Sequence, residues 1–344
     1  MRVMLACGGT GGHIFPALAL ARELEKRGHK VLMLTDERGA RFVKDEIPVA
    51  EIPATPFFGR SLGDKLRAGK AYIKGRRKSV ELIDEFKPNV VIGAGGYASF
   101  PVIRAAQAKG LPYFLLEQNS VPGRVTRMTT RGAKEVYCGI PPARNTLSKT
   151  LERKVIVTGN ILRKSVVIKD RKEGEEILVL GGSGGARRLN ELGYELAQRM
   201  PRERFIILTG KRDYEEMSAK PTLDNLELVE FTDHPEELYA RAKTAISRAG
   251  AIALSELLAN GIPSILLPFP YAVDDHQTHN ARWAAQAGAA VLIPEKEIER
   301  VEIVLKELLQ DKTRRELMSV AGKELVPTDA AARIAERIEG CLAA

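Results

Sequence analysis

The sequence predicts an α/β protein made of two doubly wound domains. The chain has 344 residues, 44% of them hydrophobic and 28% charged, which suits a globular protein with about two cores. Short apolar runs that end near glycine alternate with segments of helical period. A glycine-rich segment also occurs twice, at residues 7–13 and 180–186, about half the chain apart. The alternation predicts parallel sheets covered by helices, and the repeat predicts two such sheets.

The apolar runs are the predicted strands, and the segments between them, such as residues 14–28, 100–109 and 187–200, are the predicted helices. In the first half the predicted strands are residues 2–6, 30–35, 90–92, 113–116, 135–137 and 155–158. In the second half they are residues 177–180, 205–208, 244–246, 264–267 and 290–292. Each glycine-rich segment therefore follows the first strand of its half and opens a helix.

The repeat divides the chain into a first domain at residues 1–160 and a second at residues 161–328. A charged loop at residues 169–174 lies near the boundary. Residues 329–344 are expected to form a C-terminal helix that packs back on the first domain. Ligands of open α/β sheets bind at the carboxyl ends of the strands. The two domains are therefore expected to face one another across a cleft that both glycine-rich segments line.

The net charge of +9 is concentrated in the first domain. Residues 1–160 contain 27 Lys and Arg against 14 Asp and Glu, whereas residues 161–344 contain 26 against 30. A basic half indicates an anionic partner. The densest basic segment, residues 57–78, also carries apolar side chains, which is typical of helices that bind anionic membrane surfaces, although a solvated helix face is the alternative. The predicted membrane patch comprises Phe57, Phe58, Leu66, Tyr72, Ile73, Arg76, Arg77 and Lys78.

Other features limit the possible partners and the compartment. No DNA-binding or RNA-binding motif accompanies the basic segment, so nucleic acid is not a predicted partner. The cysteines Cys7, Cys138 and Cys341 lie far apart, which indicates neither a disulfide framework nor a structural zinc site. No stretch approaches the 18 or so apolar residues of a membrane span. The sequence predicts a cytosolic protein that touches a membrane only from outside.

A glycine-rich turn between strand and helix lets backbone amides approach a phosphate, and the helix N-terminus adds partial positive charge. A tight turn alone could also need these glycines. Two copies, one with Thr10 and one with Ser183, favour phosphate binding. Neither copy is a dinucleotide fingerprint, because Ile14 stands at the third glycine position of the first, and neither is a P-loop. NAD enzymes and NTPases are therefore disfavoured.

His13 lies where the first glycine-rich segment becomes a helix, at the carboxyl end of a strand. A helix N-terminus disfavours the imidazolium, so the ring is expected to be neutral and able to accept a proton. The alternative is a histidine that only caps the helix. We interpret His13 as the candidate general base.

Two clusters in the second half suggest recognition of a sugar nucleotide. Residues 247–256 are expected to form another loop and helix start that could bind an anion. Glu256 is placed to accept hydrogen bonds from ribose hydroxyls; the alternative is a carboxylate exposed on the helix. After the apolar run at 265–269, Asp275, Gln277 and Asn280 are expected to recognise a sugar. His276 and His279 could bind a metal, but no third ligand lies nearby. The chain has no Asp-x-Asp, so helix N-termini and arginine are expected to meet the diphosphate charge.

Seven short segments, spread over essentially the whole chain, form one ordered set: residues 8–13, 95–101, 117–119, 159–163, 181–186, 248–256 and 275–280. In order and spacing they resemble the MurG-type glycosyltransferases of bacterial cell-wall synthesis. These enzymes transfer N-acetylglucosamine from UDP-N-acetylglucosamine to undecaprenyl-pyrophosphoryl-N-acetylmuramyl pentapeptide. The resemblance implies the GT-B fold of two Rossmann-like domains, with the donor on the second domain and the lipid acceptor on the first. It also implies peripheral attachment to the cytoplasmic face of the plasma membrane.

The resemblance implies roles for individual residues, with UDP-N-acetylglucosamine as co-substrate and no cofactor or metal. Implied donor contacts are Thr10, Gly11, Gly12, Asn119, Arg163, Ser183, Thr232, Ala251, Ile252, Ala253, Leu254, Ser255, Glu256 and Gln277. Implied acceptor contacts are Gly12, His13, Gly95, Gly96, Tyr97 and Ser99. Two residues depart from the family pattern. Arg127 stands near a position where the family has asparagine, and Phe100 replaces a small residue before Pro101 and would narrow the acceptor loop.

The implied reaction inverts the anomeric carbon, because the acceptor 4-hydroxyl attacks in line as UDP leaves. Other functions stay open from the residues alone. Another GT-B transferase with a lipid acceptor, or a UDP-N-acetylglucosamine epimerase, would use the same donor contacts. A sugar-nucleotide sensor would bind without turnover, against which His13 and the loop at 95–101 argue. An oxidoreductase would bind NAD.

Overall fold

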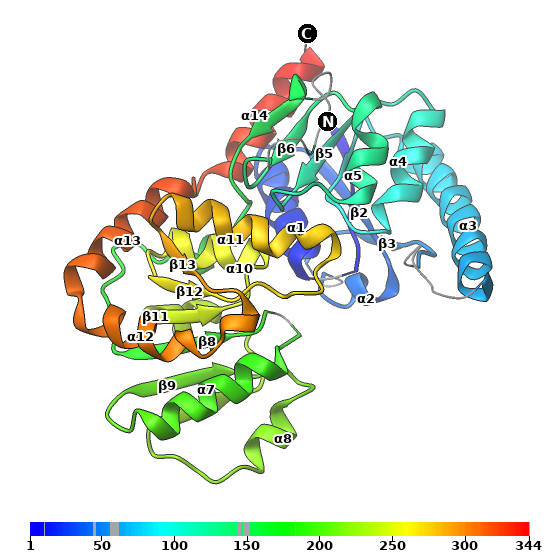
Figure 1. The fold of residues 1–344 in the computed structure, drawn as a ribbon. Coiled ribbons are helices and arrows are strands. Elements are labelled where there is room, and N and C mark those ends of the chain that lie inside the picture. Colours follow the sequence, from blue (N-terminus) through cyan, green and yellow to red (C-terminus); the bar gives the residue numbers. More distant parts are fainter. Residues whose placement is uncertain are drawn as a thin grey trace. The chain divides into compact units, whose positions relative to one another are not determined.

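Two parallel sheets, one in each half of the chain, organise the fold (Figure 1). The computed structural model describes residues 1–9, 11–43, 46–55, 62–142, 146, 152–182 and 184–343. The chain divides into a first unit, Met1–Arg163 with Asp329–Ala344, and a second unit, Lys164–Thr328. The first division between units thus follows Arg163, close to the boundary expected at residue 160.

In the first unit the strand order is β3-β2-β1-β4-β5-β6-β7, and every neighbouring pair is parallel. The strands are β1 (Arg2–Ala6), β2 (Lys30–Thr35), β3 (Val49–Glu51), β4 (Val90–Gly93), β5 (Tyr113–Glu117), β6 (Val136–Cys138) and β7 (Val155–Val157). The helices are α1 (Gly11–Lys26), α2 (Glu37–Ala40), α3 (Leu62–Phe86), α4 (Ser99–Ala108), α5 (Arg124–Thr129), the 3-10 helix η1 (Thr130–Gly132) and α14 (Ala330–Ala343).

Successive side chains of β1 point to opposite faces of this sheet, as the pleat requires. Val3 and Leu5 join a buried cluster with residues of α1 and α14, whereas Met4 and Ala6 join one with residues of α3 and α4. Because both faces are covered, the strands are apolar on both sides. This is why the sequence shows them as continuous apolar runs.

The C-terminal helix α14 lies with the first unit, although it follows the second in sequence (Figure 1). Ile334 and Ile338 are fully buried in the cluster that includes α1. Beside this apolar contact, Arg27 pairs with Glu339 at 3.1 Å. A buried seam with an ion pair at its border thus fastens the end of the chain to the first unit.

In the second unit the strand order is β10-β9-β8-β11-β12-β13, again parallel throughout. The strands are β8 (Glu176–Leu180), β9 (Arg204–Leu208), β10 (Leu226–Val229), β11 (Ala242–Ser247), β12 (Ser264–Leu266) and β13 (Ala290–Leu292). The helices are α7 (Arg187–Arg199), α8 (Tyr214–Ser218), α9 (Pro235–Arg241), α10 (Ala251–Ala259), α11 (His276–Gln286), α12 (Arg300–Gln310) and α13 (Lys312–Leu325), with 3-10 helices η2 (Lys164–Val166), η3 (Val273–Asp275) and η4 (Glu295–Glu297).

All the strands that the sequence predicts are present, most of them within one residue of the predicted ends. The short strands β3 and β10 are not among the predicted ones. Both lie at a sheet edge, where partial exposure and charged residues such as Glu227 weaken the apolar signal. The two glycine-rich segments also differ. Helix α1 already begins at Gly11, whereas α7 begins only at Arg187, after the last glycine of its segment.

Candidate active site

The carboxyl ends of β1 and β4 lie side by side, and the loops that follow them pack backbone against backbone. A Cβ on Gly8 would overlap the methyl group of Ala98, and a Cβ on Gly96 would overlap the carbonyl of Gly8. Gly96 also has a φ of +74°, which favours glycine. These glycines are therefore required by the close approach of the two loops, in addition to any role in binding.

The ring of His13, in the first turn of α1, is held by the end of β5. Its Nδ1 lies 3.0 Å from Oε1 of Gln118, whose Nε2 donates to the carbonyl of Ala94 at 3.1 Å. Because the Gln118 amide already donates to Ala94, its oxygen faces the ring, and Nδ1 carries the proton. The basic nitrogen of the neutral ring is then Nε2. This is the tautomer that a general base at Nε2 needs.

Gly95 completes the support of this ring. A Cβ at Gly95 would lie 2.7 Å from Nδ1 of His13 and 3.3 Å from Oε1 of Gln118. The φ of Gly95 is +88°. The sequence names Gly95 and His13 as separate contacts, and the structure brings them together. It adds Gln118, which is 4% exposed and which the sequence analysis assigns no role.

Two other predicted acceptor residues already have partners within the protein. The Ser99 hydroxyl is buried and donates to the carbonyl of Gly96 at 2.8 Å. The Tyr97 hydroxyl donates to Asp36 and accepts from Arg38. Asp36 and Arg38 are absent from the sequence prediction. An acidic residue directly after the second strand of a doubly wound sheet, at its carboxyl edge, is the signal that could have found Asp36.

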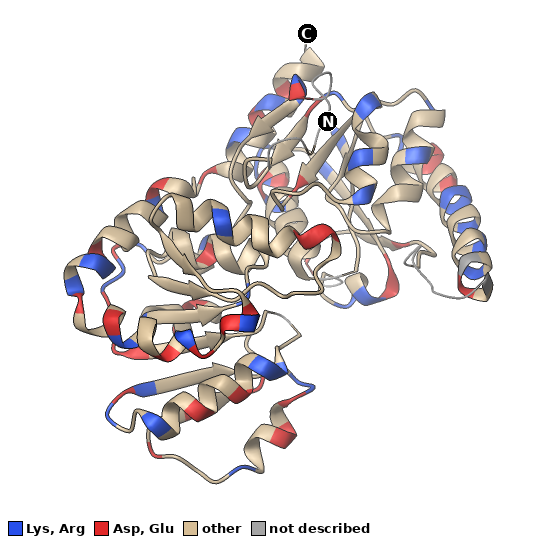
Figure 2. Cartoon of the chain, viewed as in Figure 1, with Lys and Arg blue, Asp and Glu red and all other residues tan. Residues whose placement is uncertain are grey.

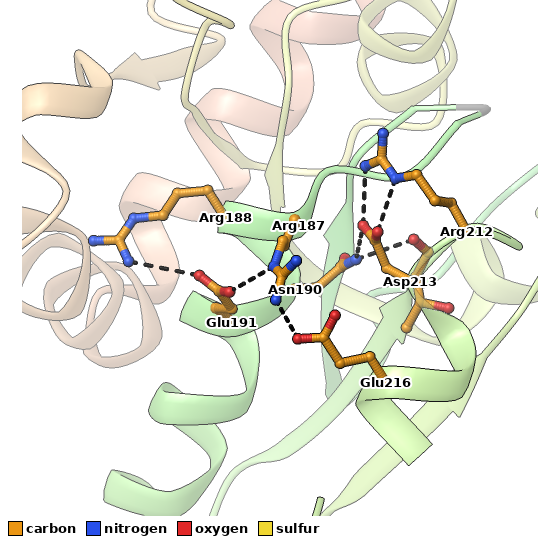
Figure 3. Close-up of polar contacts among 8 residues, drawn as sticks. Arg187, Arg188, Asn190, Glu191, Arg212, Asp213 and Glu216 are labelled. Atoms are coloured by element: carbon orange, nitrogen blue, oxygen red, sulfur yellow. Dashed lines mark hydrogen bonds and ion pairs between the residues drawn. The ribbon is translucent and has the colours of Figure 1, made fainter. Parts of the chain in front are cut away.

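The second glycine loop follows β8 and is joined to the loop after β9. A Cβ on Gly185 would overlap the carbonyl of Thr209, so these two loops also pack closely. Asn190 of α7 is fully buried and donates to the carbonyl of Thr209 at 3.0 Å and to Asp213 Oδ2 at 3.2 Å. Figure 3 shows Asn190 and Asp213 meeting between α7 and the start of α8, with Arg212 bound to the same carboxylate.

Arginines surround this loop, but they are paired. Figure 3 shows Arg187, in the first turn of α7, bound to Glu191 and to Glu216 of α8. Arg188 lies 3.8 Å from Glu191. The electrostatic field at the second loop is therefore that of a helix N-terminus flanked by ion pairs.

Helix α10 begins at Ala251, and the N–H groups of Ile252 and Ala253 in its first turn have no carbonyl of the helix to bond to. The N–H of Leu254 donates to the carbonyl of Gly250 at 2.9 Å. Two side chains of α11 hold the backbone of Ala249, which precedes α10. Gln277 Oε1 accepts the N–H of Ala249 at 3.2 Å, and Asn280 Nδ2 donates to the carbonyl of Ala249 at 3.0 Å. Asn280 is fully buried. Its expected contact with a sugar is therefore wrong for this structure, because the side chain is used to hold the loop that starts α10.

Glu256 is 8% exposed and accepts the hydroxyl of Tyr239 at 2.8 Å. The alternative of an exposed helix carboxylate is wrong, because Tyr239 of α9 covers this part of α10. A buried carboxylate that one hydroxyl orients can accept further hydrogen bonds from a ligand. Tyr239 is a residue that sequence reasoning missed.

The remaining predicted residues are dispersed. Thr10, Ser183, Phe57 and Phe58 lie outside the described residues. In the first unit, the guanidinium of Arg163 lies 4.6 Å from the ring centroid of Phe15, and a Cβ on Gly11 would overlap the same ring. Gly12 is the second residue of α1. The N–H of Asn119 donates to Glu117 Oε1 at 3.1 Å. In the second unit, the Thr232 hydroxyl accepts the N–H of His234 at 2.9 Å.

The predicted membrane patch maps to α3, which Figure 2 shows lined with basic residues. Leu66 and Ile73 are 62% and 67% exposed, and Arg76, Arg77 and Lys78 are exposed as well. Tyr72 differs, because its ring packs on Phe100 of α4 with centroids 5.4 Å apart. Phe100, the residue that departs from the family pattern, therefore packs against α3.

No metal-binding group of three or more His, Cys, Asp or Glu exists in the part of the chain that the structure describes. The Nδ1 atom of His276 lies 2.9 Å from the carbonyl oxygen of Val273, within hydrogen-bond distance. Among the same described residues, no helix is long and apolar enough to cross a bilayer.

Comparisons with known proteins decide the family. Residues 3–138 match the Glycosyltransferase family 28 N-terminal domain, and residues 176–337 match the Glycosyltransferase family 28 C-terminal domain. The chain belongs to glycosyltransferase family 28. Two relatives share the name UDP-N-acetylglucosamine--N-acetylmuramyl-(pentapeptide) pyrophosphoryl-undecaprenol N-acetylglucosamine transferase. The one from Halothermothrix orenii is 34% identical over 94% of this chain and 95% of its own length, and the one from Shewanella amazonensis is 36% identical over 97% and 96%.

Solved structures agree with the family 28 assignment. The crystal structure of Acinetobacter baumannii MurG matches with 28% identity and a TM-score of 0.78, over 98% of this chain and 99% of that chain. The UDP-GlcNAc 2-epimerase from Neisseria meningitidis, bound to UDP-GlcNAc, matches with a TM-score of 0.70 at 16% identity, over 99% of this chain and all of that chain, which concerns the fold alone. The predicted resemblance and the GT-B fold of two Rossmann-like domains are confirmed for this family 28 glycosyltransferase.

Proposed function

We propose that this family 28 glycosyltransferase transfers N-acetylglucosamine from UDP-N-acetylglucosamine to the 4-hydroxyl of undecaprenyl-pyrophosphoryl-N-acetylmuramyl pentapeptide, with inversion. The name that relatives share over nearly their whole length supports the substrates. The observation that carries the chemistry is the His13–Gln118 pair, which leaves Nε2 of a fixed imidazole as the basic nitrogen.

The proposed reaction is a single displacement at the anomeric carbon of N-acetylglucosamine. Nε2 of His13 accepts the proton of the acceptor hydroxyl as its oxygen attacks the anomeric carbon. The new bond from carbon to oxygen forms while the bond to the UDP oxygen breaks, and the electron pair leaves with UDP. We assign the negative charge of the leaving group to the N–H groups of Ile252 and Ala253, in the first turn of α10, and to the second glycine loop. Buried Glu256 is assigned to the ribose hydroxyls.

The test is turnover of the purified protein with defined substrates. UDP should form only when UDP-N-acetylglucosamine and a lipid-linked muramyl acceptor are both present, and the product should carry the new sugar in inverted linkage. Consumption of UDP-N-acetylglucosamine without acceptor would instead indicate an epimerase, whose fold is also similar. Equal turnover with diacylglycerol would indicate a different lipid acceptor, and binding without turnover would indicate a sensor.

We further propose that α3 brings the protein to the anionic cytoplasmic surface of the membrane, where a lipid-linked acceptor lies. Leu66 and Ile73 share one exposed face, and the bases around them attract anionic lipid by about 1 kcal/mol each. Arg77 and Lys78 both lie near the single carboxylate of Glu81, at 3.3 and 3.7 Å, so the end of the patch keeps net positive charge.

Vesicle sedimentation tests this attachment. The protein should sediment with phosphatidylglycerol vesicles and not with phosphatidylcholine vesicles, and high salt should release it. Replacement of Arg76, Arg77 and Lys78 by glutamate should abolish sedimentation. The matched control replaces the exposed Lys306, Lys312 and Lys323 of the second unit by glutamate, which changes the net charge equally. Equal loss in both triple variants would mean that net charge and not α3 attracts the membrane.

A further inference from the structure

Asp36, directly after β2, is a buried carboxylate that the proposed reaction does not use. It is 5% exposed. Its Oδ1 accepts the N–H of Gly39 at 3.1 Å, which caps α2, and also the N–H of Gly9 at 3.3 Å. Its Oδ2 accepts the hydroxyl of Tyr97. One carboxylate therefore joins the first glycine loop, the start of α2 and the loop after β4.

This is more than a helix cap requires. A cap needs one acceptor, and asparagine or serine would supply it equally well. At Asp36 two further donors converge from loops distant in the sequence, and the guanidinium of Arg38 lies 3.5 Å from Oδ2. Burial raises the pKa of Asp36, but the hydrogen bonds from Tyr97, Gly39 and Gly9 and the charge of Arg38 outweigh it and hold the pKa below its usual value. The group is thus an anion around which the loops are arranged.

The ring of Tyr97, in the loop after β4, packs against the first glycine loop. A Cβ on Gly9, which has a φ of +85°, would be 3.2 Å from Cε1 of Tyr97. The ring therefore lies against the backbone of Gly9 while its hydroxyl is held by Asp36. Burial, followed by the hydrogen bond to Asp36, raises the pKa of the Tyr97 phenol. The Tyr97 ring and the Gly9 peptide are both fixed by the same carboxylate.

We infer that Asp36 is a positioning residue for the lipid-linked acceptor, because it holds the Gly9 loop and the Tyr97 ring in one arrangement. The inference rests on the proposed function and on the acceptor contacts that the family resemblance implies for Gly12, His13 and Tyr97. Asp36 bonds to Gly9 and Tyr97, neither of which is an implied donor contact, whereas Tyr97 is an implied acceptor contact. The effect of Asp36 is therefore expected on the acceptor and not on the donor nucleotide. Its loss should therefore change one Michaelis constant and spare the other.

The first experiment uses Asp36→Asn, which keeps the shape and a capping acceptor but removes the charge that Tyr97 and Arg38 share. The KM for the lipid-linked muramyl acceptor should rise about tenfold, the loss expected for one charge-assisted hydrogen bond, while the KM for UDP-N-acetylglucosamine stays unchanged. The matched control is Glu37→Gln, the next residue, whose exposed carboxylate pairs only with Arg41 among the described residues. This control should behave as wild type.

The second experiment measures the titration of Tyr97 by tyrosinate absorbance, with Tyr97→Phe identifying its contribution. The charged groups that act on the phenol are Asp36 and Arg38. Loss of the carboxylate removes the anion that opposes ionisation, so Asp36→Asn should lower the pKa of Tyr97. An unmoved titration would contradict the contact between Asp36 and Tyr97 on which the inference depends. Tyr97→Phe should itself raise the acceptor KM, and adding Asp36→Asn to it should have less than its full effect.

An unchanged acceptor KM in Asp36→Asn, with wild-type turnover present, would overturn the inference and reduce Asp36 to a cap. Equal increases in both Michaelis constants would overturn it as well, because the effect would then be general. If Asp36→Asn does not fold, Tyr97→Phe decides, and an unchanged acceptor KM in that variant would be fatal to the inference. Absence of any transfer by the wild-type protein would instead refute the proposed function.

Discussion

The two glycine loops come from one sequence repeat, yet the structure supports them in opposite ways. The first is covered, because a Cβ on Gly8 would overlap Ala98 and one on Gly9 would meet Tyr97. The second is open in its middle, since a Cβ on Gly182 or Gly184 would meet no described atom within 4 Å. Near the first loop lie His13 and the Asp36–Tyr97 pair, and near the second lie the amide of Asn190 and the ion pairs of Arg187 and Arg212. We interpret the first as a loop that holds reacting groups and the second as one that offers backbone.

The acidic residues next to the two loops sharpen this difference. Asp36 and Asp213 both follow the second strand of their own sheet. Asp36 bonds directly to the first loop through the N–H of Gly9, whereas Asp213 accepts from Asn190 of α7, whose amide also donates to the carbonyl of Thr209. Hydrogen bonds from Arg212, opposed by partial burial, lower the pKa of Asp213. An aspartate thus follows the second strand of each sheet, directly after β2 in the first unit and five residues after β9 in the second, with different connections.

The largest effect is expected at His13, because the comparison places the chemistry at the first loop. His13→Ala should reduce kcat by about 10²–10⁴ and leave UDP-N-acetylglucosamine affinity nearly intact. Steady-state kinetics and donor titration by calorimetry measure the two quantities. Near-normal turnover would return His13 to a capping role and would remove the chemical difference between the loops.

The second prediction concerns the donor unit. Glu256→Ala should weaken UDP-N-acetylglucosamine binding by about 1.5–3 kcal/mol, the cost of a lost charge-assisted hydrogen bond. Tyr239→Phe is the matched control, because it removes one hydrogen-bond donor to Glu256 and leaves the carboxylate. Its effect on binding should be smaller, about 1 kcal/mol or less. Equal effects in calorimetry would mean that Glu256 serves Tyr239 and not the nucleotide.

Alanine substitutions at Gly8 and Gly184, one glycine from each loop, test the packing difference. Gly8→Ala should lower the free energy of unfolding by about 1–3 kcal/mol, because its methyl group meets that of Ala98 in a packed region. Gly184→Ala should change the free energy of unfolding by less than about 0.5 kcal/mol. Urea unfolding measures both. If Gly184→Ala weakens UDP binding while stability is unchanged, its openness serves the ligand; equal destabilisation of both variants would contradict the comparison.

The strands of both sheets could be predicted because buried parallel strands are continuous apolar runs, and residues 2–6 and 30–35 match β1 and β2. The difference between the loops could not. Composition is nearly the same in residues 8–12 and 181–185, and what differs is the neighbour of the second glycine. A Cβ on Gly9 would meet the ring of Tyr97, whereas a Cβ on Gly182, the matching position, would meet no described atom within 4 Å. A pattern within one segment carries no information about which distant segment will pack on it.

The same reason explains which site residues were predictable. His13 and Glu256 stand in motifs and could be named from the sequence. Gln118, Tyr239 and Asp36 are supporting side chains whose importance depends on contacts between distant segments, for example the 3.0 Å contact between His13 and Gln118. Asn280 shows the converse, because it stands in a motif and yet is buried beneath Ala249. Motifs identify where a site lies more reliably than which side chains reach the ligand.

The smallest expected effect tests whether the first loop holds a titrating base at all. Gln118→Glu places a carboxylate about 3 Å from Nδ1 of His13, and a negative charge there favours the imidazolium. Only the neutral ring can accept a proton, so the acidic limb of the kcat profile should move to higher pH, by about one unit, while the rate on the plateau falls less. Gln286→Glu, the same change at an exposed position at the end of α11, should leave the profile in place. An unmoved limb in Gln118→Glu would mean that His13 does not titrate in the reaction, and both loops would then act only by binding.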